Sequence, residues 1–485
     1  MLRTPHLPQL AWWLFCLTLL LMPLPLGGNR SWILLIVVPG LAATWALLLA
    51  SHDSRQQLGR AIRLAGIPLA CLAGIALLQS VQSLALPASW LATISTGLGQ
   101  VWQGQPGGSL SLDRFNTQLY ATLTLCYASA FIFIQYFALQ SARLIKRLML
   151  ALVLAGIFQA VVGIYLYSVN ADYTLFHFAL HHVRTLGTFT YHNHYAFYLV
   201  MALCLGLGLI MAEPAAQQGG GWKHHLNKLL AFVESRKMLL RLGLIVVVIA
   251  LVLTKSRMGN AAFFTALLAS MALYLFLVKP RNKNLLWLVA SVVVIDIVVL
   301  GSWVGLDKVA ERIGNTALSK DSATLSAMIR GQENSPEWPR DESVEARLLP
   351  ADYAVNIIKD YPLTGTGAGS FYTIFPTYKP ATVNHFYDHA HNDYVELLTD
   401  HGFIGISLFA ALVLCVIART IAVLRHRKSA LAKGLAFSTT MACCAALLHS
   451  LVDFNLQVPT NAMLFTCILG LGWSAGFIER PARQL

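Results

Sequence analysis

The residues best suited to chemistry are four histidines in the segment HFYDHAHNDYVELLTDHGFIG, residues 385–405. Asp393 and Glu396 have the D-x-x-E spacing of a capping box, which predicts a helix that starts at Asp393. Gly402 fits the left-handed position that ends such a helix. His391 would then lie just before a helix N-terminus, where the helix dipole disfavours the protonated imidazole. A neutral His391 could take the proton from a sugar hydroxyl as that hydroxyl attacks.

Two other interpretations of these histidines stay open. The side chains could be structural, stacking on aromatic rings, capping helix ends and forming hydrogen bonds. They could also bind zinc, because His385, His389 and His391 could supply three nitrogen ligands. No acidic or thiol side chain is spaced to complete that site. We therefore expect neither a metal ion nor a cofactor.

Two arginines stand at the starts of apolar runs. Arg257 lies in LTKSRMGN, residues 253–260, which predicts a tight turn, and Arg184 lies in HHVRTLGTFTYHNHYAF, residues 181–197. Guanidinium groups match phosphate oxygens with two parallel hydrogen bonds. Two convergent arginines could therefore hold a lipid-diphosphate leaving group without a metal ion. The alternative for Arg257 is an interfacial side chain that reaches the lipid headgroups.

Three further features could contribute. Asp296 lies within an apolar run, where a carboxylate could relay protons or form a buried hydrogen bond. His449 and Asp453 are four residues apart, so on one helix they would share a face and could support the site. The glycine-rich PLTGTGAGSF, residues 362–371, neither follows a strand nor carries GK[ST]. Nucleotide binding there is therefore not expected.

The composition indicates that these residues belong to a membrane protein. Hydrophobic residues make up 56% of the 485 residues and charged residues only 12%, against about 25% charged in globular proteins. The net charge of +13 does not predict nucleic-acid binding. The basic residues lie between hydrophobic runs, as they do in the loops of membrane proteins. All eight cysteines lie in apolar stretches without CxxC spacing. They are expected to be core residues of helices.

The apolar runs predict an all-α polytopic protein of about twelve transmembrane helices, each needing roughly 20 apolar residues. The runs are 10–27, 32–50, 64–82, 117–138, 148–168, 194–212, 238–254, 260–278, 285–303, 403–418, 435–452 and 461–478. Most Lys and Arg residues lie in segments on the same side as both termini, which places the termini in the cytoplasm. Short loops on the other side hold only Arg30, Arg114, Arg184, Lys255 and Arg257.

This topology divides the chain into three parts. Residues 1–303 form the first nine helices, 304–402 a large periplasmic loop with the catalytic region, and 403–485 the last three helices. Within the large loop, residues 343–360 have helical spacing. The smaller outside loops 83–116 and 169–193 could pack under it.

Taken in order along the chain, the motifs resemble the O-antigen ligase and Wzy-type polymerase superfamily. They are R-x-x-G-T-F-x-x-x-N, then S-R-x-G between two spans, then R…P-L-x-G-x-G-x-x-x-F, then H-x-H-N-D-Y…E-L-L…H-G-x-x-G. HSLVDFNLQVPTNA, residues 449–462, is also similar to a late stretch in many members. The resemblance covers roughly residues 180–475, and the first five spans match only by topology.

The resemblance implies a bacterial inner-membrane glycosyltransferase of the GT-C type, metal-independent and inverting. Such enzymes take an oligosaccharide from undecaprenyl diphosphate on the periplasmic face. The resemblance implies that His391 is the general base and that Arg184 and Arg257 bind the diphosphate. Arg347 matches the arginine that heads the third motif. The residues that could support the site are Arg347, His389, Asn392 and Asp453.

The acceptor is another lipid-linked repeat for a polymerase, a lipid A core for a ligase, or a protein hydroxyl for an O-oligosaccharyltransferase. We favour a polymerase of O-antigen or exopolysaccharide over a ligase. The expected partners are the lipid-linked glycan, an acceptor glycan or lipid, and membrane lipids; a chain-length regulator could also bind. Two other classes stay open: a transporter, suggested by the number of spans and Asp296, and a non-catalytic scaffold for polysaccharide export.

Overall fold

The described part of the chain is almost entirely helical. The computed structural model describes residues 6–174, 184–212, 236–278, 344–380 and 387–479, and only the backbone of 236–237 and 344–349. The long helices are α1 (His6–Leu21), α2 (Leu34–Leu49), α3 (His52–Gln82), α6 (Arg114–Gln140), α7 (Ala142–Ser168), α8 (His192–Met211), α10 (Arg236–Leu253), α11 (Arg257–Leu277), α17 (Asp393–His426), α18 (Ala430–His449) and α19 (Pro459–Ser474).

The short elements lie between the long helices. They are β1 (Leu86–Pro87), α4 (Ala88–Ile94), α5 (Thr96–Val101), β2 (Gly107–Gly108), α15 (Val344–Asp360), α16 (Phe371–Tyr378) and the 3-10 helices η1 (Leu26–Gly28), η2 (Ser31–Ile33) and η4 (Asn455–Gln457). The two strands pair antiparallel, with Leu86 opposite Gly108.

The described helices follow the predicted apolar runs. Eight of them are long and apolar enough to cross a membrane, by length and composition. Two shorter apolar helices are α1 and Met238–Leu253 of α10. Every predicted run coincides with a helix except 285–303, which lies outside the described residues together with Asp296. The helix α3 also includes residues 52–63, ahead of its predicted run of 64–82, and its backbone is non-helical at Gly66, close to the predicted start.

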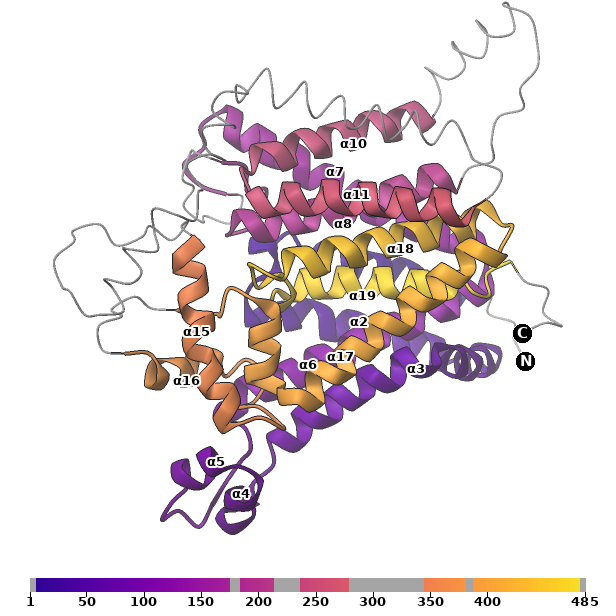
Figure 1. The fold of residues 1–485 in the computed structure, drawn as a ribbon. Coiled ribbons are helices and arrows are strands. Elements are labelled where there is room, and N and C mark those ends of the chain that lie inside the picture. Colours follow the sequence, from indigo (N-terminus) through magenta and orange to yellow (C-terminus); the bar gives the residue numbers. More distant parts are fainter. Residues whose placement is uncertain (1–5, 175–183, 213–235, 279–343, 381–386, 480–485) are drawn as a thin grey trace, which may run out of the picture.

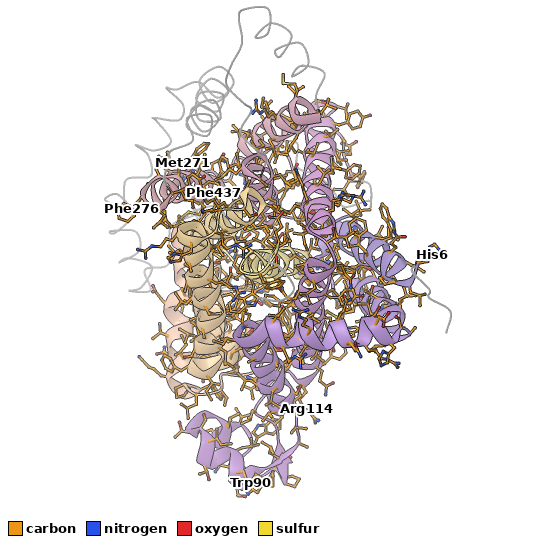
Figure 2. The ribbon with its side chains drawn as sticks, turned by 90° about the vertical axis from the view of Figure 1, so that its right-hand side faces the viewer. His6, Trp90, Arg114, Met271, Phe276 and Phe437 are labelled. Atoms are coloured by element: carbon orange, nitrogen blue, oxygen red, sulfur yellow. The ribbon has the colours of Figure 1, made fainter. Side chains whose placement is uncertain are left out.

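Large apolar side chains face outward from the helix bundle. Phe276 of α11 is 80% exposed and Leu35 of α2 is 77% exposed, and Figure 2 shows Phe276 at the edge of the bundle. Water penalises apolar surface by about 25 cal/mol per Å², whereas lipid does not. The outward apolar surface and the spanning helices identify a multi-pass membrane protein, as the composition predicts.

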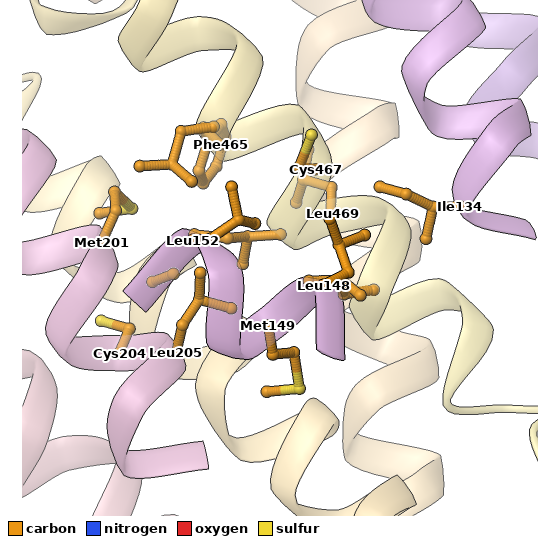
Figure 3. Close-up of a cluster of buried hydrophobic side chains, with 14 of the residues drawn as sticks. Ile134, Leu148, Met149, Leu152, Met201, Cys204, Leu205, Phe465, Cys467 and Leu469 are labelled. Carbon is orange, nitrogen blue, oxygen red and sulfur yellow. The ribbon is translucent and has the colours of Figure 1, made fainter. Parts of the chain in front are cut away.

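The centre of the bundle lies where α6, α7, α8 and α19 meet (Figure 1). Figure 3 shows side chains of all four helices gathered in this core, among them Leu152 of α7 and Leu205 of α8. Most of the cysteines are buried and all are free thiols, which confirms their prediction as core residues. The apolar window of α8 is 89% buried. The polar residues at its start must therefore find partners within the protein.

Hydrogen bonds join the ends of several helices at one end of the bundle, here called the site end. Thr460 Oγ1, at the start of α19, donates to Met22 O after α1 at 3.2 Å. Asp393 N, at the start of α17, donates to Ser450 O after α18 at 3.0 Å. Helices α1 and α18 thus end, and helices α17 and α19 begin, at this end of the bundle.

An outer subdomain, formed by residues 83–113 and 344–378, packs on the site end. Ser95 Oγ donates to Asp360 O at 2.5 Å and so links α5 to α15. Figure 2 shows Trp90 of α4 at the tip of the part that projects beyond Arg114. The predicted helix 343–360 is α15, and the predicted packing of loop 83–116 is confirmed. The buried apolar cluster that joins the two segments contains Leu91, Leu98, Leu110, Ala354, Ile357, Tyr361, Phe371, Ile374, Phe375, Tyr387 and Ala390.

The glycine-rich loop 362–370 fills a bend in α17. Thr366 N donates to Thr399 O at 2.8 Å, and Phe403 N donates to Pro362 O at 2.8 Å. Gly402 has φ +61° and ψ −165°, so its φ is positive as predicted but its conformation is not the left-handed helical one. The first turns of α17 end at this kink, as predicted, and the membrane span continues beyond it. This loop is therefore a packing element between α15 and α17.

Replacing Gly402 with alanine should destabilise the protein by about 2 kcal/mol or more, because its backbone conformation of φ +61° and ψ −165° is open essentially only to glycine. In addition, a Cβ at this position would lie 2.3 Å from Leu363 O. Thermal unfolding in detergent measures the effect. Gly59→Ala in α3 is the matched control, since a Cβ there meets nothing within 4 Å. That variant should gain up to about 1 kcal/mol from helix propensity. Equal unfolding temperatures for the two variants would contradict this account of the bend.

Candidate active site

The candidate base His391 lies in the short segment that leads into α17. Asn392 caps this helix, because its Oδ1 accepts hydrogen bonds from Tyr394 N at 3.0 Å and Val395 N at 3.2 Å. Asn392 Nδ2 also donates to Leu451 O at 2.9 Å. The predicted start of the helix at Asp393 is thus right, but the predicted capping box is wrong. The cap is the residue before it.

The carboxylates of Asp393 and Glu396, which the capping box would use, form tertiary contacts instead. Asp393 is buried and accepts a hydrogen bond from Ser450 Oγ at 2.7 Å. Glu396 accepts from His389 Nδ1 at 2.6 Å and from Ala390 N at 3.0 Å. One carboxylate therefore ties the start of α17 to the end of α18, and the other ties it to the segment that precedes His391.

The ring of Phe454 brings three histidines together. It stacks on His389 with centroids 4.0 Å apart and an interplanar angle of 15°. His391 and His194 meet the same ring edge-on, at 5.0 Å and 4.6 Å. Tyr191 stacks on Phe454 at 6.2 Å. This one aromatic side chain, from the connection between α18 and α19, thus links the His391 segment to the start of α8.

Asp453 lies beside Phe454 and is buried. Its carboxylate accepts a hydrogen bond from Asn193 Nδ2 of α8 and lies 3.9 Å from His194 Nε2. The prediction that His449 and Asp453 share a helix face is wrong, because α18 ends at His449. Asp453 instead belongs to the connection to α19, and this position allows it to reach the start of α8.

Arg184 precedes α8 and contacts its first residue. Its Nη1 lies 2.8 Å from His192 Nε2, and His192 in turn packs against Tyr191 with ring centroids 4.8 Å apart. Thr185, the next residue, donates from its Oγ1 to Ala250 O at 3.0 Å. Arg184 is therefore held between the start of α8 and the last turn of α10.

Arg257 is the first residue of α11 and is exposed. Ser256 caps this helix by accepting a hydrogen bond from Gly259 N at 3.1 Å. The predicted tight turn is confirmed, since only Thr254, Lys255 and Ser256 separate α10 from α11. The turn follows the end of α10 that Thr185 contacts, so the segments of both arginines lie at the site end.

The structure thus brings His391, His389, Asn392, Asp453 and Arg184 into one connected set of contacts, with the Arg257 turn beside it. Arg347 lies in the first turn of α15, and its side chain is outside the described part of the chain, as is all of His385. Among the side chains that the structure does describe, no three of His, Cys, Asp or Glu are arranged to hold a metal ion.

Sequence reasoning missed several members of this site. These include Glu396 as a partner of His389, and Phe454 as the shared ring. One signal was present for the polar start of α8: a His-Asn-His triplet heads an apolar run, and a helix at the centre of a bundle rarely carries unpaired polar groups. The missed residues at that start are His192, Asn193 and His194.

Glu396 also changes the protonation of His389. The His389 side chain is 23% exposed and that of Glu396 only 1%. Burial by itself lowers the pKa of His389, but the charge and hydrogen bond of Glu396 outweigh it and raise the pKa from 6.5 to about 9. His389 is therefore a cation at neutral pH, and it forms an ion pair at the start of α17.

The ion pair predicts a pH-dependent contribution to stability. Because the folded pKa is raised, the contribution is complete below pH 6.5 and is lost as the pH rises through about 9. Wild type should unfold about 2 °C above His389→Gln at pH 6, and the difference should vanish near pH 10. Thermal unfolding in detergent measures it. A difference that stays constant over this range would contradict the ion pair.

A comparison with protein families gives a match over part of the chain. Residues 242–410 match the family model described as O-antigen ligase (Wzy_C), a stretch that runs from α10 into α17 and includes Arg257 and His391. No curated protein matches the chain. The match supports a membrane enzyme of the O-antigen ligase or polymerase type, acting on lipid-linked glycans. The order of motifs, the spanning helices and this match, which covers residues 242–410, together support similarity of the chain to the O-antigen ligase and Wzy superfamily.

Proposed function

We propose that the chain is an inverting, metal-independent GT-C glycosyltransferase of the bacterial inner membrane. It transfers an oligosaccharide from undecaprenyl diphosphate to an acceptor hydroxyl on the periplasmic face. His391 takes the hydroxyl proton, the acceptor oxygen forms a bond to the anomeric carbon, and the bond from that carbon to the diphosphate breaks. Arg184 and Arg257 bind the departing diphosphate and offset its charge.

One observation carries this proposal: the candidate base and a candidate phosphate-binding arginine belong to one set of contacts. From His391 the contacts pass through the ring of Phe454 to Tyr191, then to His192 and Arg184. These residues come from the α17 entry, the connection between α18 and α19, and the α8 entry. His391 and Arg184 therefore lie at the same end of the bundle. This supports the proposal that they act on one substrate, His391 as the base and Arg184 at the leaving group.

Metal independence is supported by the donor groups of the site. Guanidinium groups can offset the diphosphate charge directly, in the role that a divalent cation plays in other phosphate sites. In addition, the segment PLPLGGNR, residues 23–30, holds no carboxylate, whereas metal-dependent GT-C enzymes usually place an acidic residue there.

We favour a lipid-linked repeat as the acceptor, which makes the enzyme a polymerase of O-antigen or exopolysaccharide. The second candidate is a ligase that joins the glycan to a lipid A core, and the description of the matching family favours it. A chain-length regulator would act only on a polymerase. The two activities share the donor and the base, so they differ only in the hydroxyl that reaches His391.

Purified protein in proteoliposomes tests the proposal. The donor is an undecaprenyl-diphosphate-linked repeat, and EDTA is present throughout. Polymer formed from the donor alone supports a polymerase, whereas product formed only after a lipid A core is added supports a ligase. No covalent product in either assay would overturn the proposal. Loss of glycan flux in Asp296→Asn would then favour a transporter.

A further inference from the structure

The backbone of His391 adopts a conformation that needs support. Its φ is +49°, in the left-handed region that non-glycine residues rarely occupy, although histidine does so more often than most. Such residues persist where surrounding contacts hold them, and they cluster at functional sites. The contacts on either side of His391 therefore decide where its imidazole lies.

Hydrogen bonds hold the residues on both sides of His391. After it, Asn392 caps α17 and donates to Leu451 O. Before it, the Glu396 carboxylate accepts from Ala390 N at 3.0 Å and from His389 Nδ1 at 2.6 Å. Because Glu396 belongs to the rigid first turns of α17, it fixes the preceding segment relative to the helix.

Glu396 also reaches His391 by a second route. The His389 ring that it holds is stacked on Phe454, with centroids 4.0 Å apart. Phe454 in turn packs edge-on against His391, with centroids 5.0 Å apart. The carboxylate thus supports both the backbone before His391 and the ring that flanks its imidazole.

The neighbouring buried carboxylates of α17 have other partners. Asp393 accepts from Ser450 Oγ and Leu456 N, and Asp400 accepts from Gly369 N at 2.7 Å in the glycine-rich loop. Neither has a described hydrogen bond to residues 389–391. Among these three carboxylates, Glu396 is therefore the one with described hydrogen bonds to the residues before His391.

We propose that Glu396 is a positioning residue that holds His391 in the geometry needed to reach the acceptor hydroxyl. This role rests on the proposed function, because it assumes that His391 is the base. Glu396 acts through Ala390 and His389, and it does not touch the reacting atoms.

Two substitutions of Glu396 distinguish the effect of losing its hydrogen bonds from the effect of losing its charge. Glu396→Ala removes both hydrogen bonds, and displacement of the base should lower kcat by about 10²-fold. The donor KM should stay within about twofold, because the described hydrogen bonds of Glu396 go to His389 and Ala390 and not to Arg184 or Arg257. In Glu396→Gln the amide oxygen still accepts from Ala390 N, and the amide nitrogen can donate to a neutral His389. This variant should retain kcat within about fivefold.

Asp388→Asn is the matched control. This exposed carboxylate lies next to His389 in the sequence, so its replacement removes the same charge without removing the two hydrogen bonds. Its kcat should stay within about twofold of wild type. Wild-type turnover in Glu396→Ala, or a loss confined to the donor KM, would overturn the positioning role.

Hydrogen–deuterium exchange of the peptide that contains Ala390 gives a readout that does not depend on activity. Glu396→Ala should speed exchange of this amide at least about tenfold, since it loses its acceptor, while peptides of α18 keep their wild-type rates. Unchanged exchange would overturn the role of Glu396. Faster exchange in a protein whose wild type transfers no glycan would instead overturn the proposed function alone.

Discussion

Replacing His391 with alanine should lower the rate of glycan transfer by about 10³-fold, the range in which general bases contribute. Without a base, the acceptor hydroxyl must lose its proton to water as it attacks. The measurement is glycan assembly in a deletion strain complemented with wild type or variant at matched membrane levels. We expect product to disappear and the lipid-linked precursor to accumulate, because the donor still binds.

His426→Ala is the control for this experiment. His426 is exposed at the far end of α17, away from the site end, and its loss should leave assembly at the wild-type level. Normal product from His391→Ala would show that this residue is not the base. A loss of product in both variants would point to a general defect in the membrane-inserted protein.

Replacing Arg257 with alanine should lower kcat/KM for the lipid-linked donor by about 10²-fold or more, as loss of a charge-stabilising donor does in other active sites. Arg257→Lys should recover part of this, because an ammonium keeps the charge but not the two parallel hydrogen bonds of a guanidinium. Steady-state transfer in proteoliposomes measures both variants. The order wild type, lysine, alanine is the expected result.

Arg425→Ala provides the comparison for Arg257. Arg425 is also an exposed arginine, but it lies in the last turn of α17 at the end opposite the site. Its replacement should leave kcat/KM unchanged. Equal activities of Arg257→Ala and wild type would support the alternative in which Arg257 only contacts lipid headgroups.

Local patterns predicted the helical membrane fold well. A span needs a continuous apolar run, because lipid cannot pair with backbone polar groups and each helix must satisfy its own. The runs are visible without knowledge of their neighbours, and all those in the described part of the chain are helices. The positive φ of Gly402 and the tight turn before Arg257 were also predicted from local patterns. Backbone conformation at both places depends mainly on adjacent residues.

Side-chain partners were predicted less well. The D-x-x-E spacing of Asp393 and Glu396 is the same whether the carboxylates cap their own helix or bind elsewhere. In the structure, Ser450 donates a hydrogen bond to Asp393 and His389 donates one to Glu396. Asn392 forms the helix cap. Spacing cannot distinguish these outcomes, because the competing donors come from segments that are not part of the local pattern.

The sequence therefore establishes the membrane class, the helices, and the residue types available for base and phosphate chemistry. It does not establish which of them meet. Asn193 and Asp453 are joined by a hydrogen bond across 260 positions of the chain, and the ring of Phe454 contacts that of His194 across the same separation in sequence. Such contacts depend on how helices pack in three dimensions, because a ring or a carboxylate binds whichever partner the packed helices bring within reach.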